Sequence, residues 1–130
     1  YVEKEADLEK AVSIVANAKM RRTGICGATE TLIIDKEVSE NYLPPIVNKL
    51  EQLNCSLVGD EYSRAVCSNI GVATLKDWTT EYLAPQLSIK VVNGIEEAIQ
   101  HISTYGSQHT DAIITENEKK ANFFCRGFYV

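Results

Sequence analysis

The amino-acid sequence predicts an α/β fold of three layers, α/β/α, in which a mostly parallel sheet carries helices on both faces. Short apolar or β-branched segments alternate along the chain with amphipathic helical segments. This order requires crossover connections between parallel strands, which place helices over the sheet. A chain of 130 residues has the commonest size of one domain. We therefore expect a single domain over residues 1–130.

The first part of the chain carries two predicted helices and two predicted strands. Apolar residues at helical spacing follow Asp7, a suitable N-cap, and predict an amphipathic helix over residues 7–21. The apolar segment 31–34 then predicts a strand. Helical periodicity returns over residues 38–53, although Pro44 and Pro45 are expected to kink or restart that helix. A short strand is predicted at 56–58.

The remainder of the chain begins with a stretch that indicates little regular structure. Residues 61–67 predict a short helix and residues 69–74 a loop or short strand, but the stretch 60–86 is expected to be mostly irregular. Alternating β-branched residues then predict a strand at 87–92, and helical spacing predicts a helix at 95–105 closed by Gly106. The pattern ends with a predicted strand at 112–115 and a predicted helix over about 117–125.

Composition and charge exclude several classes of function. The chain has 18 acidic and 13 basic residues, a net charge of −5, which argues against a broad nucleic-acid-binding surface. It has no apolar stretch long enough to span a bilayer and no apolar signal segment at its N-terminus, so we expect a cytoplasmic protein that does not enter membranes.

Four cysteines are widely spaced and form no CxxC pair, which predicts four free thiols and no metal site. Cys26 is the candidate nucleophile among them, because it lies in a glycine-flanked turn between a helix and a strand. Nearby cations at Lys19, Arg21 and Arg22 would favour its thiolate. A buried and inert Cys26 is the alternative, since free cysteine is often buried. The other three cysteines are interpreted as packing residues: Cys55, Cys67 and Cys125.

The segment 92–113 contains an unusual cluster of polar residues between a predicted helix and a predicted strand. It resembles the signature of gamma-glutamyl phosphate reductases, a branch of the aldehyde dehydrogenase superfamily, at these positions: Ala98, Ile99, His101, Ile102, Tyr105, Gly106, Ser107, His109, Thr110, Asp111 and Ile113. Three further segments are similar to the same family in the same order, at residues 7–22, 25–32 and 77–92. The resemblance extends over about residues 1–125, and it implies an aldehyde dehydrogenase-like catalytic domain.

This resemblance implies an activity. Members of the family use NADPH to reduce L-glutamyl 5-phosphate to L-glutamate 5-semialdehyde with release of phosphate, in proline biosynthesis. The family's Cys-x-Ala-x-Glu-Thr motif corresponds here to Cys26, Ala28, Glu30 and Thr31, and its cysteine is the nucleophile that forms a thioester. Gly27 stands where many relatives have asparagine, which leaves the contacts beside the nucleophile open.

Four other residues are candidates for the site. Glu81 precedes Pro85 as in the superfamily's pattern that contacts the nicotinamide ribose, although Leu83 and Ala84 depart from that pattern. A solvated loop carboxylate is the alternative for Glu81.

For substrate binding, the candidates are His109 and Thr110 of the signature, and Arg22, whose cation could attract the anionic substrate. Structural roles are the alternatives: His109 could stabilise a turn, and Arg22 could interact with a helix C-terminus. His101 is expected to be a capping or packed surface histidine.

Compared with the family, the chain is expected to be an isolated catalytic domain without the cofactor-binding domain and the C-terminal segment. We therefore expect little turnover from this chain alone, although its parent would act on a small molecule and assemble as a homo-oligomer. Two other functions stay open at this stage. The chain could be a non-catalytic module that assembles with a partner, or an α/β domain that binds an unrelated acidic metabolite near residues 105–111.

Overall fold

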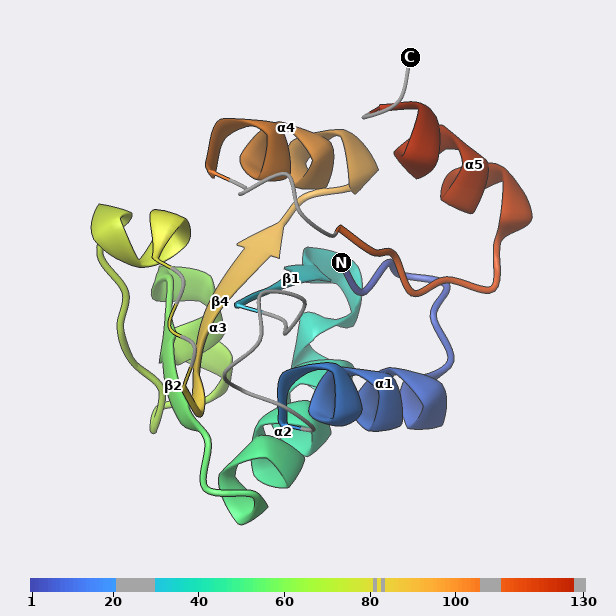
Figure 1. Ribbon diagram of the computed structural model, residues 1–130. Coiled ribbons are helices and arrows are strands. Elements are labelled where there is room, and N and C mark those ends of the chain that lie inside the picture. Colours follow the sequence, from blue (N-terminus) through green and yellow to red (C-terminus); the bar gives the residue numbers. More distant parts are fainter. Residues whose placement is uncertain (21–29, 81, 83, 106–110, 128–130) are drawn as a thin grey trace.

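The computed structural model describes residues 1–20, 30–80, 82, 84–105 and 111–127 (Figure 1). Helices and strands alternate along the described chain. Their order is α1 (Leu8–Met20), β1 (Thr31–Asp35), α2 (Lys36–Gln52), β2 (Ser56–Gly59), α3 (Glu61–Val66), β3 (Gly71–Val72), the 3-10 helix η1 (Leu75–Thr79), β4 (Gln86–Val92), α4 (Ile95–Tyr105) and α5 (Glu118–Arg126).

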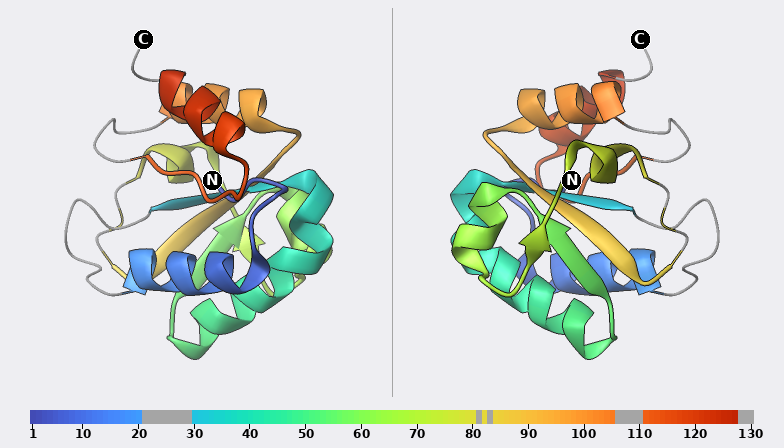
Figure 2. Two further views of the ribbon diagram at one scale, coloured as in Figure 1. Left: turned by 90° about the vertical axis from the view of Figure 1, so that its right-hand side faces the viewer. Right: turned by 90° about the vertical axis from the view of Figure 1, so that its left-hand side faces the viewer.

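The sheet lies between two layers of helices. Its four described strands are parallel and run in the order β1-β4-β2-β3. The helices α1, α2 and α3 lie on one face of the sheet, and α4 and α5 lie on the other (Figure 2). This confirms the predicted three-layer α/β/α fold with a parallel sheet. The non-sequential strand order follows from the crossover connections, each of which passes over a face of the sheet.

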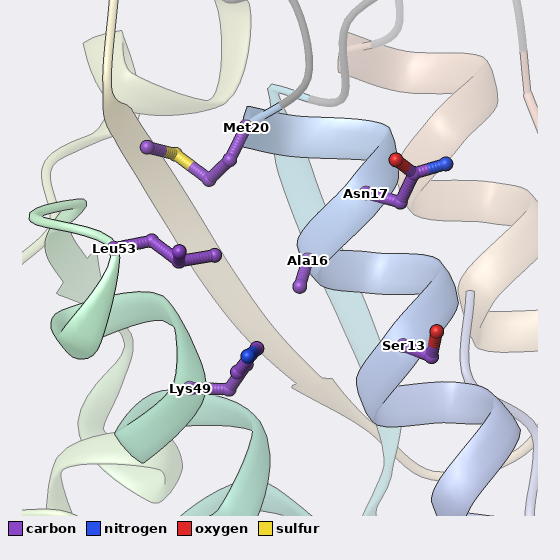
Figure 3. A pocket seen from close by; sticks show the side chains of 6 residues that line it. All are labelled: Ser13, Ala16, Asn17, Met20, Lys49 and Leu53. Atoms are coloured by element: carbon purple, nitrogen blue, oxygen red, sulfur yellow. The ribbon is translucent and has the colours of Figure 1, made fainter.

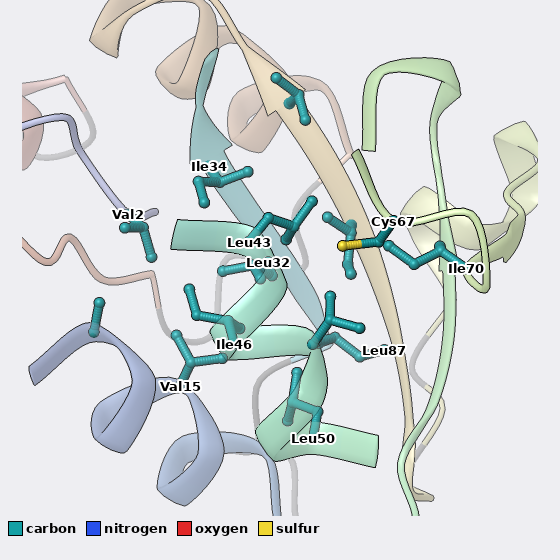
Figure 4. Packing of buried hydrophobic residues seen from close by; sticks show 14 of the residues in the cluster. Val2, Val15, Leu32, Ile34, Leu43, Ile46, Leu50, Cys67, Ile70 and Leu87 are labelled. Carbon is teal, nitrogen blue, oxygen red and sulfur yellow. The ribbon is translucent and has the colours of Figure 1, made fainter. Parts of the chain in front are cut away.

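The larger part of the hydrophobic core fills the space between the sheet and α2 (Figure 4). Leu43, Ile46 and Leu50 are at most 1% exposed and recur on one side of α2, as a helix with a single apolar stripe requires. They pack with Leu32 and Ile34 of β1 and with the alternate residues of β4. Ile33 points to the opposite face, where it joins a smaller cluster with Val92 and Ala98. Because side chains alternate between the two faces along each strand, the same strands supply apolar side chains to the core on both faces of the sheet.

The helix α2 does not restart at its prolines, so of the two predicted alternatives, a kink or a restart, the restart was wrong. Pro44 and Pro45 lie inside one helix that continues from Lys36 to Gln52. A proline removes the amide that would bond to the carbonyl four residues earlier. Those carbonyls belong to Glu40 and Asn41, which lie on the exposed side of the helix, where water can solvate them. The buried side retains its packing against the sheet.

The predicted strand at 112–115 is reduced to a single bridge. Ile114 pairs with Val2, and Val2 in turn pairs with Ile34 of β1. The amide of Val2 donates to the carbonyl of Ile33 at 2.7 Å, and the amide of Glu3 donates to the carbonyl of Ile114 at 3.1 Å. The segment around Val2 therefore lies between β1 and Ile114, where a fifth strand would otherwise pair directly.

The stretch 60–86 is more regular than predicted. The helix expected at 61–67 is present as α3, but β3, η1 and the start of β4 also fall in this stretch. These elements are short: β3 has two residues and η1 has five. Asp77 caps the start of η1, because its Oδ2 accepts a hydrogen bond from the Thr74 amide at 2.7 Å. Segments of this length show too few residues for periodicity to appear, which explains why the pattern missed them.

A buried carboxylate attaches α5 to the N-terminal segment. The side chain of Glu3 is 2% exposed, and its Oε2 accepts from Lys120 Nζ at 2.8 Å. Its Oε1 accepts from the Thr115 hydroxyl at 2.7 Å and from the Glu5 amide at 2.9 Å. Burial by itself raises the pKa of Glu3, but these hydrogen bonds outweigh it and hold the pKa below its usual value.

We expect Glu3→Gln to lower the free energy of unfolding by about 1–3 kcal/mol at pH 7, because the charge that Lys120 contacts is lost. The depressed pKa means that this contribution is present above about pH 4.3 and disappears as the pH falls through the folded-state pKa of Glu3. Urea unfolding of both proteins at several pH values measures the difference, which should shrink in acid.

Glu116→Gln is the matched control, since the Lys10–Glu116 pair is solvent-exposed at both side chains. A loss of stability for Glu116→Gln equal to that for Glu3→Gln would contradict this interpretation, as would a difference that does not depend on pH.

Candidate functional site

A buried ion pair lies where α1 ends and β1 begins. Lys19 is in the last turn of α1 and its side chain is 0% exposed, while Glu30 directly precedes β1 and is 18% exposed. The distance between Lys19 Nζ and Glu30 Oε2 is 3.2 Å. Because a charge with no access to water is costly unless it is paired, this contact allows Lys19 to stay in the core.

The same carboxylate oxygen binds a third segment of the chain. The amide of Tyr82 donates to Glu30 Oε2 at 3.0 Å, and Lys19 Nζ lies 5.6 Å from the centroid of the Tyr82 ring. We call these three residues, Lys19, Glu30 and Tyr82, the Glu30 junction. It connects the end of α1, the beginning of β1 and the segment between η1 and β4.

The Glu30 junction is anchored on two sides. The amide of Ser88 in β4 donates to the Glu30 carbonyl at 3.1 Å, so the backbone of Glu30 is aligned with the sheet. The Tyr82 hydroxyl donates to Asp77 Oδ1 at 2.8 Å, which attaches Tyr82 to η1. Burial, followed by the nearby Asp77 carboxylate, raises the pKa of Tyr82. The phenol is therefore a neutral hydrogen-bond donor at physiological pH.

The predicted site residues themselves lie outside the described residues: Arg22, Cys26, Glu81, His109 and Thr110. Their chain neighbours are informative nevertheless. Glu30 follows Cys26 by four positions, and Tyr82 follows Glu81 directly. Tyr82, the chain neighbour of the candidate Glu81, therefore donates a hydrogen bond to Glu30, which lies close to the candidate Cys26 in the sequence. Tyr82 and Glu30 are 52 positions apart along the chain.

Sequence reasoning gave no structural role to Lys19 and Glu30. It treated Lys19 as one of three cations that would favour a thiolate at Cys26, whereas the structure pairs that cation with Glu30. One signal could have revealed this. Lys19 follows the buried Val15 by four residues, on the same side of α1, and a lysine on an apolar helix face requires a buried partner.

His101 packs between two aromatic rings in the described part of the chain. Its ring centroid lies 5.2 Å from that of Trp78 and 4.8 Å from that of Tyr105. Burial, helped by the cation of Lys90 and opposed by Asp60, lowers the pKa of His101 to about 4. The histidine is therefore neutral at physiological pH. It attaches η1 to the inner side of α4, as the predicted packing role requires.

Three cysteines are described, and all three are free thiols. Cys55 and Cys67 are buried, which agrees with their interpretation as packing residues. Burial raises the pKa of both thiols, for Cys55 against the effect of the Lys19 cation. Cys125 is exposed, so its interpretation as a packing residue was wrong. It precedes the last residue of α5, next to Phe124, which takes the buried position there.

A shallow depression of about 300 Å³ lies between α1 and α2 (Figure 3). Its walls are formed by Ser13, Ala16, Asn17, Met20, Lys49 and Leu53. Within the described part of the chain, His, Cys, Asp and Glu side chains form no group of three that could hold a metal ion. The helices of that same part include none long and apolar enough to cross a membrane.

Comparison with known sequences identifies close relatives, although no protein-family profile matches the chain. Gamma-glutamyl phosphate reductase from Caulobacter vibrioides is 51% identical over 124 residues, which make up 95% of this chain and 30% of the relative. The enzyme of the same name from Rhodospirillum rubrum is 46% identical, over 95% of this chain and 29% of the relative. The chain thus spans about 30% of the length of these curated relatives.

Solved structures agree with the sequence comparison. Gamma-glutamyl phosphate reductase from Thermotoga maritima has a TM-score of 0.95 at 39% identity, over 97% of this chain and 30% of that structure. Betaine aldehyde dehydrogenase from Staphylococcus aureus has a TM-score of 0.75 at 10% identity, over 97% of this chain and 34% of that structure, which is a likeness of fold alone. These findings confirm the resemblance to gamma-glutamyl phosphate reductases and the aldehyde dehydrogenase-like fold.

We expect His101 to titrate with a pKa of about 4, against 6.5 for an ordinary histidine. An unfolded chain binds this proton more readily, so folding stability should fall between pH 6.5 and pH 4, by up to about 3 kcal/mol. The chemical shifts of the His101 ring measure the pKa. His101→Phe should reduce the loss of stability in this pH range, and an unchanged loss would contradict the assignment.

The described thiols should differ in reactivity. Iodoacetamide at pH 8 is expected to modify Cys125 at least about tenfold faster than Cys55 and Cys67, because burial raises the pKa of those two thiols and restricts access to them. Peptide mapping over time measures each rate. If Cys55 or Cys67 reacted as fast as Cys125 in the folded protein, their burial in this arrangement would be wrong.

Proposed function

We propose that this chain, which is homologous to one segment of gamma-glutamyl phosphate reductases, is the cysteine-bearing part of such an enzyme. The whole enzyme would reduce L-glutamyl 5-phosphate to L-glutamate 5-semialdehyde at the expense of NADPH and release phosphate. The observation that carries the proposal is the 46–51% identity to enzymes of that name over a stretch that includes Cys26, Ala28, Glu30 and Thr31.

Cys26 would be the catalytic nucleophile. Its thiolate attacks the acyl carbon, a carbon–sulfur bond forms, and the carbon–oxygen bond to phosphate breaks to give a thioester and free phosphate. NADPH supplies the hydride that reduces the thioester carbonyl. The carbon–sulfur bond then breaks, which releases the aldehyde and returns the Cys26 thiolate. The oxyanion at each stage needs a hydrogen-bond donor, and the Cys26 and Gly27 amides are the proposed donors.

The remaining assignments follow the family pattern. Arg22 would attract the anionic substrate, His109 and Thr110 would contact it, and Glu81 would contact the nicotinamide ribose. Tyr82, which follows Glu81 in the chain, is fixed at two points. Its amide donates a hydrogen bond to Glu30, and its hydroxyl donates one to Asp77 of η1. The depression between α1 and α2 has no part in this assignment. Its walls include neither a candidate site residue nor a residue of the Glu30 junction, and Lys49 is its one charged lining residue.

A chimera tests the proposal. The segment of the Caulobacter vibrioides enzyme that aligns with this chain is replaced by residues 1–130, and phosphate-dependent reduction of NADP by glutamate semialdehyde is measured. We expect activity, and we expect Cys26→Ser to lower kcat by at least about 1000-fold, as removal of a nucleophile does elsewhere. Cys125→Ser, which removes an exposed thiol outside the Cys-x-Ala-x-Glu-Thr motif, should retain activity.

A folded chimera without activity would contradict the proposal and favour the alternative of a non-catalytic assembly module. Activity that survives Cys26→Ser would leave the reaction in place but remove Cys26 from it. Replacement of NADP by NAD in the same assay determines which cofactor is preferred.

A further inference from the structure

We propose that Asn93 is a site of spontaneous deamidation, at which the main-chain nitrogen of Gly94 displaces ammonia from the side chain, and that the isoaspartate product displaces α4 from the sheet. The modification requires water and no other reactant. This inference does not rest on the proposed function, because no step of the reductase reaction enters it.

The first support is that the reacting groups are free. Asn93 is exposed and Gly94 is half-buried, and both lie in the bend that connects β4 to α4 (Figure 1). Among the described residues, neither the Asn93 side chain nor the Gly94 amide has a hydrogen-bond partner. The carbon that is attacked and the nitrogen that attacks it are therefore both available.

The second support is the conformation of Gly94. Its φ is +102°, in the left-handed range that favours glycine. No heavy atom beyond its chain neighbours lies within 4 Å of the position that a Cβ would occupy. The backbone thus requires glycine here, and glycine has no side chain to hinder closure of a ring onto its nitrogen. The fold itself places beside Asn93 the residue that protects an asparagine least.

The third support is the contrast with the other asparagines, none of which is followed by glycine. Asn54 is also exposed and lies in a turn, but the amide of the next residue, Cys55, donates to the Leu50 carbonyl at 3.0 Å. The remaining asparagines lie in helices or are held by hydrogen bonds of their own side chains: Asn17, Asn41, Asn48, Asn69, Asn117 and Asn122.

The reaction balances without an oxidant or a reductant. The Gly94 nitrogen loses its proton to solvent and bonds to Cγ of Asn93, while the Cγ–Nδ2 bond breaks and Nδ2 leaves as ammonia, which takes up a proton. Water then opens the resulting succinimide ring. Opening at Cγ gives aspartate with the ordinary main chain. Opening at the main-chain carbonyl carbon gives isoaspartate, whose main chain runs through Cβ and Cγ and is longer by one carbon.

The connection that receives this carbon has no slack. Asn93 and Gly94 alone separate α4 from β4, which ends at Val92. Val92 is 1% exposed and Ala98 of α4 is 0% exposed, and both belong to the same apolar cluster. The Gly94 carbonyl also accepts from the Ala98 amide at 3.2 Å. Because a close-packed core does not absorb such a change, the longer chain must move α4 or break this hydrogen bond.

A natural reporter of such a movement lies on α4. The ring centroid of His101 in α4 is 5.2 Å from that of Trp78 in η1, and Trp78 is the one tryptophan of the chain. Displacement of α4 changes the surroundings of the indole. The fluorescence of Trp78 therefore measures the proposed effect.

The first test is incubation of the folded chain at pH 8 over several weeks, with peptide mapping by mass spectrometry and circular dichroism at intervals. We expect deamidation of Asn93 to be at least about tenfold faster than that of Asn54, because the Cys55 amide must first give up its hydrogen bond and Cys55 carries a side chain. Loss of the Asn93 amide no faster than that of Asn54 in the folded chain would overturn the proposal.

Two variants accompany this incubation. Asn93→Gln retains an amide, but closure onto Gly94 would need a larger ring, so this variant should stay unmodified at residue 93. Asn69→Gln is the matched control, since it removes another exposed asparagine and should leave the rate at Asn93 unchanged. A chain that gains negative charge equally fast with Asn93→Gln would exclude Asn93 as the site.

The second test compares the products. Anion exchange isolates the aged chain, which has gained a negative charge, and peptide mapping measures its isoaspartate content. Asn93→Asp carries the same charge on an ordinary main chain. We expect the isoaspartate-rich fraction to unfold at a lower urea concentration than Asn93→Asp and to differ from it in Trp78 emission. Equal unfolding midpoints and equal emission would overturn the proposed displacement of α4, even where deamidation takes place.

Discussion

The parallel pairing of β4 with its two neighbours is the constraint on which the rest of the structure depends. β4 pairs over five residues with β1 and over four with β2, and most of its residues are buried. Neighbouring strands that run in the same direction cannot be joined by a tight turn, so each connection must pass over a face of the sheet. The two helical layers follow from this requirement. So does the position of Glu30, whose carbonyl accepts the amide of Ser88 in β4.

Among the described residues, each buried charge is held by at least one charged or polar group. Lys19 pairs with Glu30, and Glu3 accepts from Lys120, Thr115 and Glu5. Asp35 accepts from the Glu37 amide at the start of α2 and also from the Tyr1 hydroxyl. These groups lie near the points where elements begin or end, where the backbone has amides or carbonyls without helical or strand partners. The buried charged side chains therefore lie near the ends of elements, while apolar side chains fill the space between the sheet and the helices.

The order of elements and the apolar sides of the long helices could be predicted from periodicity, because a helix such as α2 shows several turns of its pattern. The sequence-based predictions were wrong where a tertiary contact or solvent exposure outweighed a local sequence preference. Pro44 and Pro45 are tolerated because their lost hydrogen bonds face solvent. The apolar segment 112–115 pairs with Val2 instead of forming a full strand. Cys125 is exposed because its neighbour Phe124 occupies the buried position on α5.

By itself the sequence determined the fold class, the relationship to gamma-glutamyl phosphate reductases and the choice of Cys26 as the candidate nucleophile, because these depend on residue types and spacings along the chain. It did not determine that Lys19, Glu30 and Tyr82 meet. Glu30 and Tyr82 are separated by 52 positions, and their contact exists only because β1 and β4 are neighbours in the sheet. Strand order depends on how the whole core packs, and local periodicity carries no record of it. The partners of a buried charge are for that reason a property of the tertiary structure.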